Sequence, residues 1–485
     1  MKNQVQLITY VDRLTGGGLG SLAELLRGPL AGLFGGVHLL PFFFPIDGAD
    51  AGFDPIDHTN VDPRLGGWDD LAELGGGVEV MADLIVNHMS RDSAQFRDFF
   101  EKGGRSDYRD LFLTFDRVFP EGASEADLLA IYRPRPGLPF SATTLATGER
   151  RLLWTTFSPQ QLDIDVTSAA GRAYLTAVLE RFHAAKIRSI RLDAAGYAIK
   201  KRGTSCFMIP ETYAFIGELT RQAHALGIEV LVEIHSHHLQ QIEIARRTDW
   251  VYDFALPPLV LHALYQADAR PLAEWLKIRP DNALTVLDTH DGIGVIDVGA
   301  DGASRPGLLP PEAIDALVET IHERSGGQSR QATGAAANNL DLYQVNCSFF
   351  DALGGDETAY LIARAVQFFT PGIPQIYYAG LLAARNDMTL LARTGVGRDI
   401  NRPYFAPGEV EAALAQPVVA RLCELIRLRN RHPAFAGRFG ASDEGLHNLV
   451  LTWRNGADWA RLAVDFSTPR AEISCSGEDL GMIFA

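Results

Sequence analysis

The sequence contains little cysteine, and its four cysteines, Cys206, Cys347, Cys423 and Cys475, lie far apart without any CxxC pairing. Dispersed cysteines of this kind offer no metal-binding spacing and fit a reducing compartment. Long apolar runs are also absent: none reaches the ~20 residues that cross a bilayer, and Gln6 interrupts the short apolar run near the amino terminus. We therefore expect a cytoplasmic protein with no membrane segment and no signal peptide.

Basic residues are in deficit, with 44 Lys and Arg against 60 Asp and Glu and a formal net charge of −16. This balance argues against a nucleic-acid partner and against an anionic membrane, because both require a basic face. A local basic pocket for a small anion remains compatible with it. The chain of 485 residues is 47% hydrophobic and 21% charged, as in an ordinary globular protein with one large domain and additions, or several domains.

Short apolar segments alternate with segments of helical spacing along most of the chain. Eight segments have the character of buried strands: 5–11, 36–42, 78–88, 187–193, 228–235, 250–256, 283–291 and 373–380. This order predicts an α/β fold, a (β/α)8 TIM barrel with two insertions and a small C-terminal β domain. The alternative, a doubly wound open sheet, would need fewer strands.

The expected domain boundaries follow from the composition between these segments. Two stretches rich in turn residues are expected to be irregular insertions, and a Ser21 and Glu24 pattern predicts a capping box that starts the first helix. The resulting parts are barrel domain A in three pieces (1–88, 168–291 and 357–435), insertion domain B (89–167), a second insertion B′ (292–356) and the C-terminal β domain (436–485).

Polar side chains stand at the ends of four of the predicted strands. They are Asn87 and His88, Arg191 and Asp193, Glu233, and His290 and Asp291. Barrel enzymes build their sites at the carboxyl ends of the strands, so these residues are expected to converge. Carboxylates in one pocket suit glycoside cleavage, in which one acts as nucleophile or base and the other donates a proton. A nearby arginine would keep a nucleophilic carboxylate ionised, but charge alone does not assign the roles.

At these residues the sequence resembles the α-amylase-type family of retaining α-glucosidic enzymes. The family's four motifs appear as "DLIVNH" (83–88), "IRLDAAGY" (190–197), "VEIH" (232–235) and "VLDTHD" (286–291). The resemblance implies that Asp193 is the nucleophile, Glu233 the general acid/base and Asp291 the carboxylate that stabilises the transition state. It further implies glucose contacts from Arg191, His88 and His290.

Longer stretches, among them "LPFFFPIDGADAGFDPIDHTNVDPRLG", "IYRPRPGLPF" and "GRDINRPY", are similar to the sucrose phosphorylase branch of that family. The resemblance implies phosphorolysis of sucrose to α-D-glucose 1-phosphate and fructose, with no cofactor, no metal and a homodimeric assembly. Its remaining implied substrate-binding residues are Asp50, Phe53, Arg135, Tyr197, His235, Tyr343, Gln344 and Arg398. Asp50 and Arg398 would hold the far hydroxyls of glucose, while Arg135, Tyr343 and Gln344 would meet fructose or phosphate. Trp154 and Phe157 fit either the wall of the site or an aromatic core.

Other functions remain open at this level. A related phosphorylase could use sucrose 6′-phosphate, glucosylglycerol or glucosylglycerate, because these enzymes share a glucose pocket and differ in their acceptor loops. A hydrolase would carry the same carboxylates, and a non-catalytic binding subunit would typically lack the nucleophile or the acid/base. The cluster His235, His237 and His238 suggests a metal, but alternation along an extended segment would separate its last two members. Some α-amylase relatives bind calcium with a ligand at the place of Asn87, yet the first insertion has no surplus acidic cluster.

Overall fold

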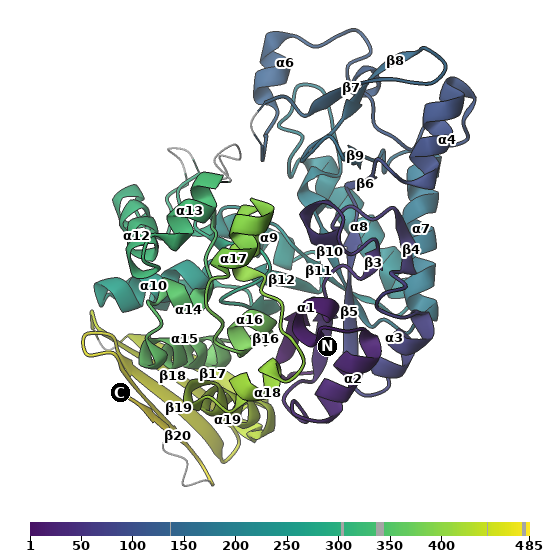
Figure 1. The fold of residues 1–485 in the computed structure, drawn as a ribbon. Helices are drawn as coiled ribbons and strands as arrows, with labels where there is room; N and C mark the ends of the chain where they lie inside the picture. Colours follow the sequence, from purple (N-terminus) through teal and green to yellow (C-terminus); the bar gives the residue numbers. More distant parts are fainter. Residues whose placement is uncertain (136, 302–304, 336–343, 444, 478–481) are drawn as a thin grey trace.

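Eight parallel strands close a barrel in the computed structural model, in the order β1-β16-β13-β12-β11-β10-β5-β2 (Figure 1). The structure describes residues 1–485 apart from 136, 302–304, 336–343, 444 and 478–481. The strands are β1 (Gln6–Thr9), β2 (Gly36–Leu39), β5 (Glu79–Ile85), β10 (Ser189–Asp193), β11 (Glu229–Val232), β12 (Trp250–Asp253), β13 (Ala283–Thr285) and β16 (Ile373–Tyr377). Each lies within a predicted segment, so the barrel prediction is confirmed.

Helices cover the outside of the barrel, as a sheet whose strands are buried on both faces requires. They include α2 (Leu19–Arg27), α3 (Trp68–Leu74), α7 (Ala169–Ala184), α8 (Pro210–Ala225), α10 (Leu256–Gln266), α15 (Glu357–Phe369) and α19 (Pro417–Arg431). The predicted capping box at Ser21 is wrong, because α2 begins two residues earlier at Leu19. Its first turn is satisfied by the backbone instead: the Leu19 amide donates to the Leu65 carbonyl at 2.8 Å.

A layer of polar side chains fills the barrel interior below the site. The Arg191 guanidinium donates to Asp83 at 2.6 Å, and the His38 ring lies 3.3 Å from the other Asp83 oxygen. The Tyr252 hydroxyl donates to Gln375 at 2.9 Å. These contacts join β2, β5, β10, β12 and β16, and they satisfy charges that would otherwise be costly to bury.

The first insertion is more regular than the sequence predicted. It contains α4 (Ala94–Lys102), α5 (Phe115–Val118), α6 (Glu125–Ala130), β7 (Phe140–Thr144), β8 (Arg150–Trp154) and β9 (Gln161–Asp163). Several of its short elements projected no clear hydrophobic period in the sequence, because they contribute only a few side chains each to a small cluster. This cluster comprises Leu113, Phe119, Ile131, Trp154 and, from the loop before α8, Cys206. Trp154 therefore packs in a core. Phe96 and Phe99 of α4 pack in the main core instead. The insertion extends from the barrel on the side away from the C-terminal sheet (Figure 1).

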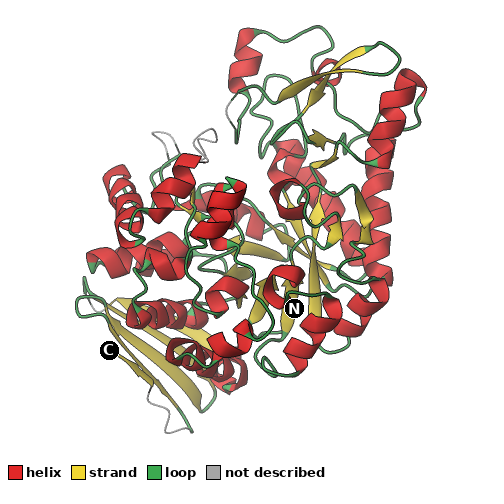
Figure 2. Ribbon diagram, viewed as in Figure 1, coloured by secondary structure: helices red, strands yellow, loops and turns green. Residues whose placement is uncertain are grey.

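The second insertion and the C-terminal sheet complete the chain (Figure 2). In the second insertion, β14 (Ile293–Gly294) pairs with β15 (Gln344–Val345), and α12 (Pro311–Arg324) and α13 (Gln328–Ala335) lie between them in sequence. The antiparallel C-terminal sheet comprises β17 (Arg438–Asp443), β18 (Asn448–Asn455), β19 (Asp458–Asp465), β20 (Arg470–Cys475) and β21 (Met482–Phe484). The Trp453 indole donates to the Phe369 carbonyl at 2.7 Å and joins this sheet to α15. The exact domain boundaries stay a prediction.

The remaining elements are short connections. They are α1 (Val11–Thr15), β3 (Phe43–Phe44), β4 (Asp57–Val61), β6 (His88–Ser90), α9 (His238–Ala245), α11 (Arg270–Ile278), α14 (Phe349–Ala352), α16 (Tyr378–Leu381), α17 (Met388–Thr394) and α18 (Glu409–Leu414). The four cysteines are buried and are not joined in disulfides. Within the part of the chain that the structure describes, no helix is long and apolar enough to cross a membrane.

Candidate active site

One pocket at the carboxyl ends of the barrel strands brings most of the predicted site residues together. It is lined by Asp50, Phe53, His88, Arg135, Asp193, Tyr197, Glu233, His235, His290, Asp291, Gln344 and Arg398. Arg191 lies beneath this lining, with 2% of its surface exposed. Tyr343 lies outside the described residues. Of the three carboxylates Asp193, Glu233 and Asp291, the first lies in a barrel strand, β10. Glu233 directly follows β11, and Asp291 lies in the loop between β13 and β14.

The pocket also contains aromatic residues that the sequence did not single out. Tyr132 stacks on Phe207 with 4.6 Å between ring centroids, and Phe207 lies 4.7 Å from Tyr197. Phe157 meets the edge of Tyr197 at 5.1 Å, so it belongs to the wall of the site. Tyr132 stands within the quoted "IYRPRPGLPF" stretch and could have been found there, whereas Phe207 carries no sequence signal and is placed by the loop before α8.

Arg191 is the cation at the floor of the pocket. One of its nitrogens is 3.1 Å from Asp193 and 2.6 Å from Asp83, and the other is 3.6 Å from Glu233. Burial raises the pKa of Asp193 and the neighbouring Glu233 carboxylate adds to this, while Arg191 opposes both. Two carboxylates close together resist double ionisation, and Arg191 is the cation that favours the ionised form of Asp193.

The far side of the pocket is held by two further arginines. Asp50 accepts from Arg398 at 3.0 Å and from Arg402 at 3.2 Å, and Arg398 also pairs with Asp291 at 2.9 Å. Burial alone would raise the pKa of Asp50, but the two guanidinium groups lower it to about 2. They also hold the pKa of the buried Asp291 carboxyl well below its usual range. Arg402, 0% exposed, is a site-supporting residue that the sequence analysis missed although it lies in the quoted "GRDINRPY".

Asp50 has a left-handed backbone conformation, with φ of 51° and ψ of 43°. Such a conformation is unfavourable for a residue other than glycine. The ion pairs with Arg398 and Arg402 help to hold it. Strain maintained by surrounding contacts is frequent at ligand sites.

Two neutral histidines line the pocket beside Phe53. His88 donates from Nε2 to the Phe53 carbonyl at 2.9 Å. His290 stacks on the Phe53 ring with 4.8 Å between centroids, and burial lowers its pKa to about 3. Burial also lowers the pKa of His88. Both rings are therefore uncharged at neutral pH and can act as hydrogen-bonding partners of a sugar hydroxyl.

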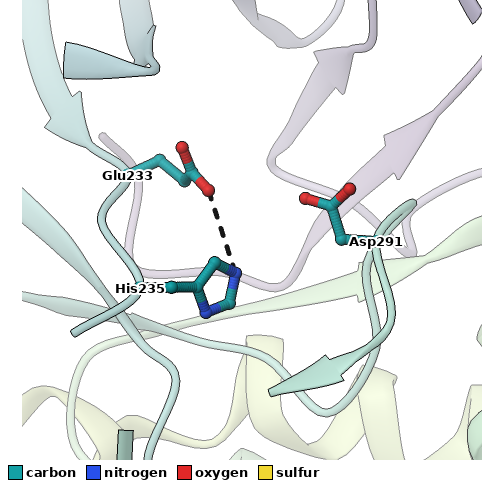
Figure 3. Close-up of side chains that lie close together, drawn as sticks. All are labelled: Glu233, His235 and Asp291. Atoms are coloured by element: carbon teal, nitrogen blue, oxygen red, sulfur yellow. Dashed lines mark ion pairs between the residues drawn. The ribbon is translucent and has the colours of Figure 1, made fainter. Parts of the chain in front are cut away.

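Glu233, His235 and Asp291 face one another across the pocket (Figure 3). His235 Nε2 is 3.8 Å from a Glu233 oxygen, and ligand-capable atoms of the three residues lie within 4.8 Å of one another. The spacing alone would suit a metal ion, but Arg398 already pairs with Asp291. We assign no metal here. His237 caps α9 by accepting from the Leu239 amide, and His238 packs on Trp275, which explains two members of the histidine cluster without a metal.

A lysine occupies the junction between the first insertion and the barrel. Lys200 Nζ lies 2.7 Å from the Asn87 side-chain oxygen and 2.6 Å from an Asp163 oxygen, and it donates to the Tyr197 carbonyl. These are oxygen donors of the type that calcium prefers. The Lys200 ammonium group therefore occupies the position beside Asn87 at which the sequence analysis considered calcium.

Comparisons with known proteins identify the family. Residues 33–254 match the model of the alpha amylase catalytic domain. The chain is 63% identical to a sucrose phosphorylase from Agrobacterium vitis, covering 98% of both chains, and 52% identical to one from Bifidobacterium adolescentis, covering 98% of this chain and 96% of the relative. It belongs to the sucrose phosphorylase family. A crystal structure of sucrose 6F-phosphate phosphorylase from Thermoanaerobacter thermosaccharolyticum superimposes with a TM-score of 0.92 at 38% identity, over 100% of this chain and 98% of that one. The family resemblance predicted from the sequence is confirmed.

Proposed function

We propose that this protein is a sucrose phosphorylase: it converts sucrose and inorganic phosphate reversibly into α-D-glucose 1-phosphate and fructose. The observation that carries the proposal is the pocket itself, in which Asp193, Glu233 and Asp291 lie together with Arg398 and the Arg135 loop. Membership of the family, at high identity to sucrose phosphorylases along nearly the whole chain, supports the choice of sucrose.

The first half-reaction uses two carboxylates in different protonation states. The Asp193 carboxylate attacks the anomeric carbon of the glucosyl unit, and the bond to the fructosyl oxygen breaks as Glu233 gives that oxygen its proton. Arg191 stabilises the ionised Asp193 from 3.1 Å. Asp291, held ionised by Arg398, stabilises positive charge that develops at the anomeric centre.

The second half-reaction releases the glucosyl group from Asp193. A phosphate oxygen attacks the anomeric carbon, the ester bond to Asp193 breaks, and Glu233, now a carboxylate, accepts the phosphate proton. Two inversions at one carbon give retention of configuration. We assign Arg135 to the phosphate, because a guanidinium can grip it through two parallel hydrogen bonds.

The ion pairs of Asp50 with Arg398 and Arg402 close the glucose side, so longer glucans are expected to be rejected. A pocket that clashes with a second ring rejects a polymer more firmly than one that merely lacks a contact. Cytoplasmic location and a homodimeric state stay predictions within this proposal.

Incubation of the purified protein with sucrose, with and without phosphate, tests the proposal directly. We expect glucose 1-phosphate and fructose in equal amounts when phosphate is present. Asp193→Asn should lose more than about 10⁴-fold of this activity, because an amide cannot form the glucosyl ester. Asp301→Asn, which changes an exposed carboxylate, is the matched control. Free glucose as the main product in excess phosphate would instead indicate a hydrolase, and glucose 1-phosphate formed only from sucrose 6′-phosphate would indicate the related phosphorylase.

A further inference from the structure

Asp297 is a buried carboxylate that the proposed mechanism does not use. It lies in the short helical turn η4 (Ile296–Val298) of the second insertion, with 0% of its surface exposed. One oxygen accepts from His235 Nδ1 at 3.1 Å. The other accepts from the Ser236 amide at 3.1 Å and from Gln241 Nε2 at 2.7 Å. All three donors belong to the segment that directly follows Glu233, so Asp297 connects the second insertion to the acid/base.

This contact fixes which nitrogen of His235 carries a proton. A carboxylate only accepts hydrogen bonds, so Nδ1 must be the donor to Asp297. The other nitrogen, Nε2, is turned toward the pocket and lies 3.8 Å from Glu233 (Figure 3). The face of the ring stacks on Phe254, with 3.9 Å between centroids and 17° between planes.

The backbone at β14 leaves room for the pair. A side chain at Gly294 would place its Cβ 2.7 Å from the Asp297 oxygen and 3.2 Å from His235 Nδ1. Distances this short would push the two groups apart, so glycine at this position permits their contact. His235 is therefore constrained by Asp297, Phe254 and the β14 backbone, and only its Nε2 edge faces the substrate space.

The charges around His235 bear on the binding of phosphate. Phosphate must approach Glu233 and Asp291, whose negative charges repel it, in a protein with a net charge of −16. Burial lowers the pKa of His235. The Asp297 carboxylate and its hydrogen bond, with smaller contributions from Glu233 and Asp291, raise the pKa by more than burial lowers it, so the pKa lies above the ordinary value. Arg398, paired with Asp291, is the cation on the other side of the pocket.

We propose that Asp297 is a positioning residue for the phosphate half-reaction: it directs His235 Nε2 into the pocket beside Glu233 and keeps that ring cationic, as an anionic acceptor requires. The inference rests on the proposed phosphorolysis. It assigns to the second insertion a role in choosing phosphate over water. A cationic donor at Nε2 adds a charge-assisted hydrogen bond to the one expected from Arg135.

The test compares Asp297→Asn, His235→Gln, the double variant and Gln241→Ala, using sucrose and inorganic phosphate as substrates. Asp297→Asn removes the charge and keeps the shape, and we expect it to raise KM for phosphate about tenfold. The alkaline limb of kcat/KM for phosphate should move to lower pH, because His235 would lose its proton earlier. Comparing each profile with that of the wild type cancels the titration of phosphate itself. The ratio of free glucose to glucose 1-phosphate should rise, while fructose release in the first turnover slows less than about threefold.

The other variants separate charge from structure. Gln241→Ala removes a hydrogen bond to the same carboxylate and no charge, so it should lower the melting temperature without moving the pH profile. The double variant should be no worse than His235→Gln, because Asp297 acts through the histidine. An unchanged pH profile in Asp297→Asn, or losses that add in the double variant, would overturn the proposal.

Two further outcomes are decisive. If Asp297→Asn does not fold, His235→Gln alone still tests the proposal, which fails if the variant keeps the wild-type alkaline limb. If the wild-type protein forms no glucose 1-phosphate from sucrose and phosphate, the proposed function itself fails, and that result requires no variant.

Discussion

The glucose side and the acceptor side of the pocket are built in different ways. On the proposed glucose side, Asp50 and Asp291 share Arg398 and Arg402, and the four side chains come from three segments that are far apart in sequence. The proposed acceptor side includes aromatic and polar residues on the inserted segments: Tyr132 is 36% exposed, and Arg133 donates to the nearby Gly137 carbonyl at 3.3 Å. In the proposed mechanism, glucose is therefore recognised by residues that long-range ion pairs hold in place, whereas recognition of the acceptor depends on how the insertions pack on the barrel.

Removing Arg402 should disrupt the glucose side most. In Arg402→Met, the buried Asp291 and the partly buried Asp50 would each lose a counter-charge, and we expect kcat/KM for sucrose to fall about 100- to 1,000-fold. Arg429→Met, equally buried but distant from the pocket, is the matched control and should destabilise the protein without this loss per folded molecule. Steady-state kinetics on samples corrected for folded fraction would check it. Wild-type kinetics in Arg402→Met would mean that Arg398 alone suffices.

Lys200 joins the first insertion, which carries part of the acceptor side, to the barrel. Its removal should therefore lower the stability of the protein. In Lys200→Met the Asp163 carboxylate, 0% exposed in its side chain, would lose its buried cation. We expect the free energy of unfolding to fall by about 3 kcal/mol. Urea unfolding measures this, and Lys201→Met, which removes an exposed partner of Glu211, should change it by less than about 1 kcal/mol. Similar small changes in both variants would contradict the structural role of Lys200.

A substitution of Arg135 tests the phosphate binding that we assign to the acceptor side. Arg135→Ala should raise the KM for phosphate by roughly 10- to 150-fold, the equivalent of one hydrogen bond to a charged group. Cleavage of sucrose should slow less, and more free glucose should form because water captures the intermediate. Arg133→Ala, on the same loop but outside the pocket lining, is the control. If Arg135→Ala keeps its phosphate dependence and product ratio, the phosphate site lies elsewhere.

Acid pH should destabilise the folded protein by a smaller amount. Burial lowers the pKa of His58 to about 4 and that of His290 to about 3. Below pH ~6.5 the unfolded chain protonates these histidines and the folded protein does not, so stability falls as pH falls. Each should contribute a loss of about 2 kcal/mol between pH 6.5 and 5. Asp50, with its pKa lowered to about 2, adds stability that is lost only below pH ~4.

Urea unfolding at pH 7 and at pH 5 measures this loss. In His58→Gln the average slope of stability against pH between pH 7 and pH 5 should decrease by about 1 kcal/mol per pH unit. Equal stability of the wild-type protein at the two pH values would show that these histidines do not control its acid sensitivity.

The sequence by itself determined the barrel and the proposed chemistry. Strands buried on both faces are continuous apolar runs, and Asp193 and Glu233 stand at or just beyond their carboxyl ends, where the barrel makes side chains converge. The order of elements alone therefore predicted one pocket with several carboxylates, and the motifs around them identified the family.

Only the tertiary structure decided which side chains pair. Arg402 on Asp50, Lys200 on Asn87 and Asp163, and Asp297 on His235 join positions that are remote in sequence or lie in different insertions. No local period or spacing encodes such pairs, because each requires two loops to be packed against the barrel in one arrangement. The same reason explains why the helices and strands of the first insertion escaped prediction: their short segments are stabilised by contacts with one another rather than by a long amphipathic pattern.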